Sequence, residues 1–500
     1  MPPDATRALQ RLIVVSALAR LACAATVGLS VDESYTVAIS RHLALSYFDH
    51  PPLHVWLAHA WAHLTGSELP LLMRVPDIVM FGASTAILYR LTDAAYGARA
   101  ALWAALAFNL APLFTLDTAG GVLPDGPLVL GALLAVWCFA RAVLTAAPDP
   151  AGRFCMLGAG TAGGLALLSK YTAVFPILAL AAYLTLSRPR WLRESATWLA
   201  ALIVVALVTP VIVWNHAHGW ASFAFQGSRA LPAGVSVARA ALDFAGQLLY
   251  LLPWIAALLL WALARALRRG PADPAGWLLA TLAVVPIGAF TLIGFWAKVL
   301  PHWPAIGWLF TFPLAGPLLA DLEARSPRLL HGIAVATAML LVGLVSLVAV
   351  QTATGALGRL VPALAAHDPT LDLLDWRALA DATERWQLRR RGVVIVTVSW
   401  IDAGKADYAL GGTLPVLCVS DDPRQFGFMY DERVFAGREA LIVAAAGRAD
   451  WLTRAAAHFR RVFPAPDIVV RRASGAAALT LHTAFGYGYE PRSSRTPNAR

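Results

Sequence analysis

The sequence predicts an all-α polytopic membrane protein of about 11 transmembrane helices, followed by a small α/β domain outside the membrane. Hydrophobic residues make up 58% of the 500 residues and charged residues only 14%, whereas about a quarter of the residues of a soluble protein are charged. The hydrophobic residues cluster in long runs, several of which reach the roughly 20 residues that cross a bilayer. From about residue 351 these runs give way to charged segments and short β-rich stretches. A single soluble globular domain is therefore excluded.

Apolar runs separated by polar loops predict the individual spans. The first run follows two arginines, as in a signal peptide, but it lacks an A-x-A cleavage pattern and many runs follow, so we expect an uncleaved helix. Only Lys170 divides residues 154–169 from 171–187, and if these formed one span, every later loop would change sides. The predicted spans lie near residues 10–30, 71–91, 99–117, 124–146, 154–169, 171–187, 196–214, 244–264, 275–296, 303–320 and 329–350.

The arginines predict the orientation of these spans, because cytoplasmic loops of membrane proteins are enriched in Arg and Lys. With a cytoplasmic N-terminus, the opposite loops hold few basic residues, and the C-terminal domain lies outside the cytoplasm. The loops expected to be cytoplasmic contain Arg7, Arg11, Arg90, Arg99, Arg141, Arg153, Arg188, Arg190, Arg193, Arg265, Arg268, Arg269, Arg325 and Arg328. The opposite loops contain Arg41, Lys170, Arg229, Arg239 and Lys298.

The segment 351–490 is predicted to form the α/β domain, and the polar residues 491–500 are predicted to be a disordered tail. Helical patterns at 373–387 and 450–459 alternate with short apolar runs rich in β-branched residues. The expected strands are 393–399, 415–419, 439–445, 468–470 and 477–481.

The charge and the cysteines exclude two other classes of site. The net charge of +10 comes from basic residues spread singly or in pairs between apolar runs, so the sequence shows no nucleic-acid-binding stripe. The four cysteines have no CxxC spacing, and they therefore predict neither a zinc site nor a disulfide framework.

The first long outer loop, residues 31–70, carries the densest group of polar side chains. Asp32 and Glu33 follow the first span, and Asp49 and His50 precede two prolines in the segment DHPPL. The segment between the two acidic groups is predicted to be a short amphipathic helix at the membrane interface. A loop that only connected two spans would need none of these features.

Further polar residues occur at the same predicted depth, at the outer ends of later spans. Asp125 lies in PDGPL, Lys170 in LLSKYT, and Lys298, His302 and Trp303 in KVLPHWPA. Charged groups facing lipid are costly, so we expect these side chains to turn inward and share a polar cavity.

These segments occur together and in an order that resembles the GT-C membrane glycosyltransferases related to the dolichyl-phosphate-mannose protein mannosyltransferases and the lipid A aminoarabinose transferases. The resemblance covers residues 10–320 and implies a catalytic GT-C domain over 1–350. It also implies transfer of a sugar from a polyprenyl-phosphate carrier to an acceptor lipid, glycan or protein. The reaction would invert the anomeric carbon at the periplasmic face of a bacterial inner membrane.

The resemblance and the chemistry of the residues together suggest roles. Asp32 matches the family's loop aspartate and is the expected base, and the charge of Glu33 would raise its proton affinity. Asp125 would bind acceptor or sugar hydroxyls, or hold a divalent cation jointly with Asp32, and the sequence leaves open whether a metal is used. The expected ligands of the donor phosphate are Lys170, Lys298, Arg41 and His302. The residues expected to bind acceptor or orient the loop are Asp49, His50 and Trp303.

Each motif also has a simpler interpretation. The acidic pair and Asp125 could cap helices, the two lysines could extend to the interface, and the histidines could orient loops. At the level of the whole protein, a lipid or sugar transporter is the main alternative function, and a non-catalytic assembly protein is another. The sequence indicates neither the sugar nor the acceptor.

Overall fold

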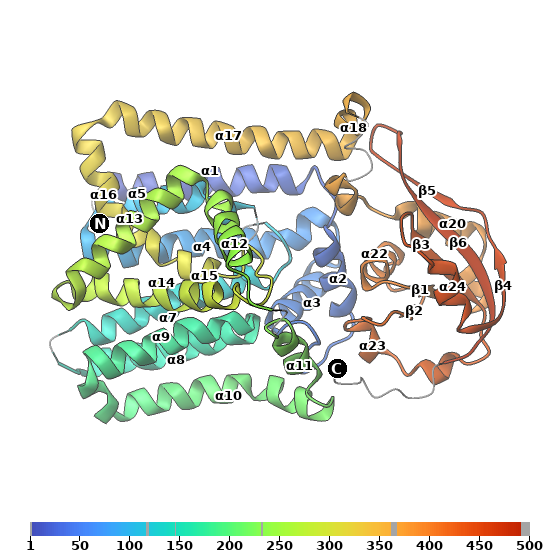
Figure 1. Cartoon of the computed structure of the whole chain (residues 1–500), viewed down its shortest axis with the longest axis horizontal. Helices are drawn as coiled ribbons and strands as arrows, with labels where there is room; N and C mark the ends of the chain where they lie inside the picture. Colours follow the sequence, from blue (N-terminus) through green and yellow to red (C-terminus); the bar gives the residue numbers. More distant parts are fainter. Residues whose placement is uncertain (1–2, 117–119, 146, 232–233, 362–367, 492–500) are drawn as a thin grey trace.

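The computed structural model describes residues 3–116, 120–145, 147–231, 234–361 and 368–491. A bundle of roughly parallel and antiparallel helices carries an α/β domain at one end, and the chain begins at the opposite end of the bundle (Figure 1). The predicted fold class is confirmed. The tail predicted over 491–500 falls, except for its first residue, outside the described residues.

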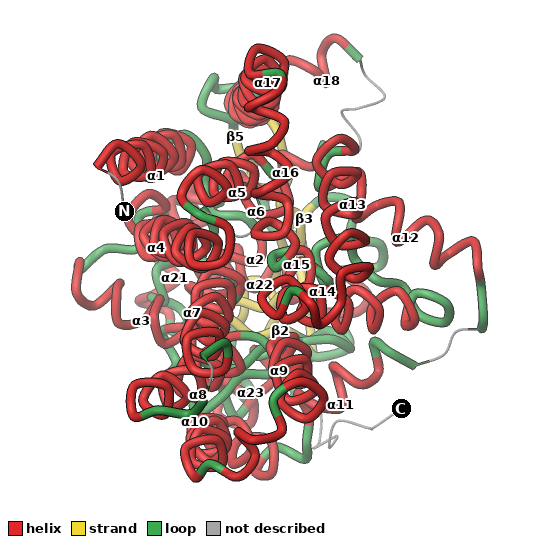
Figure 2. Tube along the Cα trace, turned by 90° about the vertical axis from the view of Figure 1, so that its left-hand side faces the viewer, coloured by secondary structure: helices red, strands yellow, loops and turns green. Residues whose placement is uncertain are grey.

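Viewed from the end at which the chain begins, the long helices of the bundle are seen nearly along their axes (Figure 2). Among the described residues, six helices are long and apolar enough to cross a membrane, or seven if one bent pair counts as a span, so the number of eleven stays a prediction. The bundle helices are α1 (Pro3–Ala24), α4 (Pro70–Tyr96), α5 (Ala98–Leu110), α6 (Pro112–Thr115), α7 (Asp125–Val143), α8 (Pro150–Ser169), α9 (Val174–Ser187), α10 (Ser195–Ala217), α13 (Pro253–Arg269), α14 (Pro274–Ile293), α15 (Ala305–Trp308), α16 (Thr311–Arg325) and α17 (Pro327–Thr354). Short 3₁₀ turns join some of them: η1 (Tyr171–Ala173), η2 (Pro189–Arg193) and η3 (Gly270–Ala272).

The division at Lys170 is present in the structure. Lys170 has an extended backbone between α8 and the turn η1, and its side chain lies at the N-terminus of α7. At the other end of the same helices, Arg153 contacts Glu194 and Arg188 donates to the carbonyl of Val143. The chain therefore reverses at Lys170, and α8 and α9 are two helices.

The predicted span 244–264 is not one straight helix. Helix α12 (Val237–Tyr250) and the helix that follows it are bent by 106° at a break near Leu252, which has a φ of 71°. Pro253 explains the break, because proline lacks the N–H that would continue the helix and disfavours helical geometry at the preceding residue. The straight helix begins only at Pro253.

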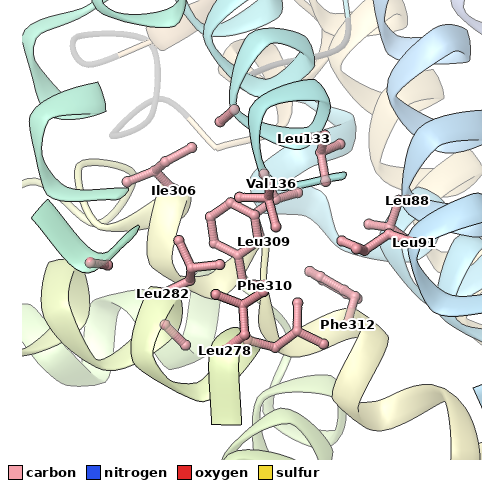
Figure 3. Packing of buried hydrophobic residues seen from close by; sticks show 14 of the residues in the cluster. Leu88, Leu91, Leu133, Val136, Leu278, Leu282, Ile306, Leu309, Phe310 and Phe312 are labelled. Atoms are coloured by element: carbon pink, nitrogen blue, oxygen red, sulfur yellow. The ribbon is translucent and has the colours of Figure 1, made fainter. Parts of the chain in front are cut away.

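The interior of the bundle is apolar and tightly packed. Large side chains from α4, α7 and α14 meet those of the α15–α16 segment (Figure 3). Small residues allow other helices to approach closely: a Cβ added at Gly160 of α8 would lie 2.5 Å from the carbonyl oxygen of Ala200. The residues labelled in Figure 3 are Leu88, Leu91, Leu133, Val136, Leu278, Leu282, Ile306, Leu309, Phe310 and Phe312.

The α/β domain contains a six-stranded sheet in the order β2-β1-β3-β6-β4, with β5 paired to β6. Strands β1, β2 and β3 are parallel, and β6 runs antiparallel to β3, β4 and β5. The strands are β1 (Val394–Thr397), β2 (Val416–Cys418), β3 (Ala440–Ala445), β4 (Phe459–Pro464), β5 (Ile468–Arg471) and β6 (Ala477–Tyr489). The helices and turns of this part are α18 (Ala356–Leu360), η4 (Pro369–Leu373), α20 (Arg377–Arg385), α21 (Leu388–Arg391), α22 (Trp400–Leu410), α23 (Phe426–Met429), η5 (Glu432–Phe435) and α24 (Trp451–Ala456).

Three short helices lie where the bundle meets the α/β domain: α2 (Val31–Ser40), α3 (Leu53–Thr65) and α11 (Ala221–Ser228) (Figure 1). Helix α2 packs directly on α22, since a Cβ added at Gly404 would lie 3.1 Å from the Cα of Tyr35. The buried Lys405 donates to the carbonyls of Leu29 and Leu374, at 2.6 and 3.1 Å. The α/β domain is thus docked on the first outer loop.

Candidate active site

Glu33 holds the first outer loop against the bundle. It occupies the third position of α2, where it forms a capping box with Ser30. Its two carboxylate oxygens also accept hydrogen bonds from Nε and Nη2 of Arg74, at 2.7 and 2.6 Å, and from the backbone of Val122 at 3.2 Å. Burial opposes ionisation, but the bonds from Arg74 keep the pKa of Glu33 below its ordinary value. These contacts make Glu33 a structural anchor.

Asp32, one residue earlier, is exposed, and the described residues offer its carboxylate no hydrogen bond or ion pair. The protein around it still withdraws some hydration, which raises the pKa of Asp32, while the positive charges of Arg424 and Lys170 act in the opposite direction. The side chain is therefore an accessible carboxylate within the electrostatic reach of two cations. A proton acceptor in a hydroxyl transfer needs this accessibility.

Asp125 and Lys170 form one ion pair. Nζ of Lys170 lies 2.9 Å from both carboxylate oxygens, and both side chains are largely buried. The pair joins the N-terminus of α7 to the end of α8, where the hydroxyl of Ser169 also donates to the carbonyl of Pro124 at 2.5 Å. Asp125 is the first residue of α7 rather than its cap, so its carboxylate is turned to Lys170.

The turn before the two prolines is held by the α/β domain. Asp49 is buried, and its Oδ2 accepts from Nη1 of Arg424 at 3.1 Å. Burial raises the pKa of Asp49 to about 6, although Arg424 opposes the shift. Phe48 donates its backbone N–H to the side chain of Gln425 at 2.9 Å, and Gln226 donates to the carbonyl of Asp49 at 2.5 Å.

Three histidines border the same region and are neutral at physiological pH. Burial lowers the pKa of His50 well below its ordinary value, that of His54 to about 3 and that of His302 to about 4; the charge of Lys170 lowers all three further. The rings of His50 and His54 lie 5.9 Å apart. His302 was predicted to bind phosphate, and a neutral ring can do so through its N–H donor.

Arg229 is a cation that the sequence-based site did not include. Its guanidinium lies 4.5 Å from the ring centre of Trp303 and 5.3 Å from that of Phe225, and within the described part of the chain it has no carboxylate partner. Its charge acts on Asp32 and Asp49. Trp303 therefore supports the Arg229 guanidinium at the edge of the site.

One predicted phosphate ligand, Arg41, is engaged in contacts outside this group. Arg41 contacts Glu68 and both the side chain and the carbonyl of Asp407, so it joins α2 to α22. Lys298 is exposed on the loop before α15. Within the described residues, no three His, Cys, Asp or Glu side chains are grouped closely enough to hold a metal ion.

The structure thus brings together Asp32, Asp49, His50, Asp125, Lys170, His302 and Trp303 from the predicted set, and adds Arg229 and Arg424. Arg74, the partner of Glu33, was also absent from the site predicted from the sequence. The sequence does carry a signal for the structural role of Glu33, because the S-x-x-E spacing of Ser30 and Glu33 is that of a capping box. No comparable signal marks Arg229 or Arg424, because each depends on a distant segment for its place.

Comparisons with known proteins agree with the fold. Residues 49–214 match the family model described as dolichyl-phosphate-mannose-protein mannosyltransferase. The chain is 24% identical over 292 residues to a lipid A galacturonosyltransferase, RgtD, of Rhizobium johnstonii, covering 58% of this chain and 59% of the relative. It is 33% identical over 166 residues to a probable arabinosyltransferase C of Mycobacterium leprae, covering 31% and 15%. The chain thus spans less than two thirds of these relatives.

Solved structures resemble the whole chain. ArnT from Cupriavidus metallidurans, in its apo state, superimposes with a TM-score of 0.66 at 17% identity over 96% of this chain and 98% of ArnT. The structure of the same protein bound to undecaprenyl phosphate gives the same TM-score. An oligosaccharyltransferase from Archaeoglobus fulgidus matches with a TM-score of 0.53 at 12% identity, over 94% of this chain and 74% of that one. The chain has the GT-C fold, and the predicted resemblance is confirmed.

Proposed function

We propose that this chain is a glycosyltransferase that moves a sugar from a polyprenyl-phosphate carrier to an acceptor hydroxyl at the periplasmic face of a bacterial inner membrane. The GT-C fold and the named glycosyltransferases among its relatives support this class of reaction. The observation that carries the proposal is the exposed carboxylate of Asp32 near the Asp125–Lys170 pair and the guanidinium of Arg229; within the described residues neither Asp32 nor Arg229 has an ion-pair partner. A base, a positioned carboxylate and a cation are the groups that this reaction requires.

Asp32 acts as the general base. The acceptor oxygen attacks the anomeric carbon, the bond from that carbon to the phosphate oxygen breaks, and the acceptor proton passes to Asp32. A single displacement of this kind inverts the anomeric carbon. Polyprenyl phosphate leaves with the bonding electrons, and the protonated Asp32 returns its proton to solvent, to which it is exposed.

The leaving phosphate gains negative charge and needs fixed cations. Arg229 is suited to this role, because its guanidinium is supported by Trp303 and has donors without a carboxylate partner in the described structure. Lys170 donates twice to Asp125, and an ammonium group has a third N–H for the donor. His302 adds a neutral donor. The role of Asp125, held in place by Lys170, is to bind a hydroxyl of the sugar or acceptor.

The relatives are named for different sugars, galacturonic acid, arabinose and mannose. We therefore propose a hexosyl or pentosyl donor and leave the choice to the assay. The alternative of a transporter is less favoured, because transporters bind substrate near the middle of the membrane at corresponding broken helices. The polar group here gathers at one end of the bundle, against the α/β domain.

The test uses purified full-length protein reconstituted in liposomes with a panel of polyprenyl-phosphate sugars and candidate acceptors. We expect transfer from at least one donor, a product of opposite anomeric configuration by NMR, and no comparable transfer by the Asp32→Asn variant. A second arm measures movement of labelled donor between leaflets. Movement without transfer, with Asp32→Asn behaving like the wild type, would replace this proposal by the transporter.

A further inference from the structure

One turn of the α/β domain reaches into the candidate active site. The backbone N–H of Gln425 donates to the hydroxyl of Tyr35 at 3.0 Å, and its side chain accepts from Phe48. The neighbouring Arg424 pairs with the buried Asp49, so this turn contacts both α2 and the segment before the two prolines. These are contacts between segments almost 400 residues apart in the chain.

The side chain of Arg424 is fixed on several sides. Its guanidinium lies 4.2 Å from the ring centre of Trp400 and 5.0 Å from that of Phe225, and its Nε contacts Asp422 at 3.3 Å. Its backbone has a φ of 52°, which is unfavourable for a residue with a side chain. A rigid, aromatic-supported arginine in a strained turn is a costly feature for a surface loop.

We propose that Arg424 is a positioning residue of the active site: by pairing with Asp49 it holds the turn 47–50, and with it His50, beside the Asp125–Lys170 pair. The α/β domain is then a part of the catalytic unit. The kinetic consequences of this inference rest on the proposed function. The positioning itself can be measured separately, by hydrogen exchange of residues 47–50.

The physical reason lies in the burial of Asp49. Among the residues that the structure describes, its Oδ1 has no hydrogen-bond partner and Arg424 is the cation bonded to its Oδ2, so Arg424 is the charge that compensates this carboxylate. Loss of Arg424 leaves this carboxyl buried without its counter-charge, so Asp49 must either take up a proton or draw water into the turn, and both weaken the hold on the turn. Because His50 follows directly, its ring would move with the turn. Misplacement of reacting groups by about 1 Å can cost roughly a hundredfold in rate.

Arg424 also contributes charge at Asp32. The groups that act on Asp32 are the cations Arg424, Lys170 and Arg229, and the anions Glu33 and Asp372. Removing one cation from this set raises the pKa of Asp32, so the acid limb of the rate profile should move to higher pH. A residue with a purely structural role would leave this limb in place.

The variants are Arg424→Gln, Arg424→Lys, Asp49→Asn and the double variant Arg424→Gln/Asp49→Asn. The matched control is Arg433→Gln, which removes an arginine of the same domain from an exposed pair with Asp431, where the side chains are 84% and 49% exposed. Each protein is assayed for transfer over a range of pH. Hydrogen exchange of the segment 47–50, which includes the bonded amide of Phe48, is measured in parallel.

We expect Arg424→Gln to lower turnover by roughly tenfold to a hundredfold relative to Arg433→Gln, and to speed exchange of residues 47–50. Arg424→Gln should move the acid limb of the pH–rate profile to higher pH in both the wild-type and the Asp49→Asn backgrounds. Arg424→Lys should return the acid limb to its wild-type position but restore only part of the rate. The double variant should lose no more than the worse single variant, because both changes break one contact.

Turnover and exchange equal to those of Arg433→Gln would overturn the inference, as would a double-variant loss equal to the product of the two single losses. If the wild type transfers no sugar from any donor, the proposed function fails, yet the exchange comparison still decides whether Arg424 holds the turn. Global unfolding of Arg424→Gln would appear as faster exchange throughout the α/β domain. In that case the turnover and exchange of Arg424→Lys decide the inference.

Discussion

Asp32 and Glu33 are neighbours in α2, but they point in different directions and have different roles. Successive residues of an α-helix point about 100° apart, so a pair at the start of α2 cannot both face the same surroundings. Glu33 turns inward to Arg74 and the cap, and Asp32 remains exposed. The charge of Glu33 still raises the pKa of Asp32, as the sequence predicted, but the Glu33 side chain itself is an anchor and only Asp32 is accessible.

Glu33→Gln and Asp32→Asn should therefore fail in different ways. Breaking one side of a buried ion pair costs about 3–5 kcal/mol, because Arg74 would stay buried without its counter-charge. We expect Glu33→Gln to lower the unfolding temperature strongly. Asp32→Asn should melt like the wild type and lose at least roughly a hundredfold in turnover. Thermal unfolding in detergent and transfer assays on the same preparations check both.

Asp372→Asn is the matched control for this comparison, since Asp372 is another exposed carboxylate whose charge acts on Asp32. It should keep most of the activity. Near-normal transfer by Asp32→Asn would make Asp32 structural, and the base would then have to be sought at Asp49 or Asp125.

Lys170→Ala should weaken use of the lipid-linked donor more than use of the acceptor. The variant removes a cation next to the expected phosphate and also frees the carboxylate of Asp125. A hydrogen bond to a charged group is worth about 1.5–3 kcal/mol, which corresponds to roughly a tenfold to hundredfold loss in kcat/KM for the donor. Steady-state kinetics with each substrate varied in turn measure the two effects.

The outcome is sharper if Lys298→Ala is measured alongside. Lys298 was predicted as a second phosphate ligand, and its loss leaves the Asp125–Lys170 pair intact, so we expect its effect on the donor to be smaller. An unchanged donor requirement in Lys170→Ala would remove Lys170 from the phosphate site and leave it as the counter-ion of Asp125.

At the scale of secondary structure, the long apolar runs predicted the long helices well. Whether a residue prefers lipid or the bundle interior to water depends mainly on its own side chain, which the sequence shows directly. The same reasoning failed at a break within an apolar run and at a charged strand on the edge of the sheet. Pro253 divides α12 from α13 within one apolar run. Strand β4, Phe459–Pro464, was missed because it carries two arginines at the edge of the sheet, where exposed charged side chains are tolerated.

The contact between α2 and α22 offers a test at this scale. Gly404→Ala adds a methyl group 3.1 Å from the Cα and Cβ of Tyr35, so the two helices must move apart. We expect lower transfer activity, because Asp32 lies on the same helix as Tyr35, and faster hydrogen exchange in α2.

Gly343→Ala on α17 is the control for this substitution. Apart from the backbone of its own helix and its chain neighbours, no described atom lies within 4 Å of the added methyl group at that position, and replacing glycine by alanine in a helix usually gains about 1 kcal/mol. It should leave activity unchanged and stability equal or higher. If Gly404→Ala behaved in the same way, close packing of the α/β domain on α2 would not be needed for activity.

At the scale of the whole molecule, the candidate site is built from the first outer loop, the ends of three parts of the bundle and one turn of the α/β domain. Sequence reasoning placed Asp125, Lys170 and His302 at one depth because each lies at the end of an apolar run. It could not say which charges pair. Arg229 reaches the site through Trp303, and Arg424 through Asp49, and both partnerships exist only after the chain has folded.

The ion pairs and loop contacts of the chain also predict its orientation in the membrane. The contacts separate the loops into two ends: Arg99 with Glu323, Arg153 with Glu194 and Arg188 with Val143 join the arginine-rich loops at one end. The pairs of the candidate site join the loops at the other. Because arginine-rich loops stay in the cytoplasm, Asp32, Asp125, Lys170, His302 and the α/β domain should all face the periplasm.

Single cysteines placed beside Lys170, in the 188–193 loop and in the α/β domain test this arrangement in a variant whose four native cysteines are replaced. A membrane-impermeant thiol reagent added to intact spheroplasts should label the first and third positions, and should label the loop only after the membrane is opened. The loop serves as the internal control for leakage. Labelling beside Lys170 only from the cytoplasmic side would contradict the orientation. It would also place the candidate site away from the periplasm, where the acceptor is proposed to be.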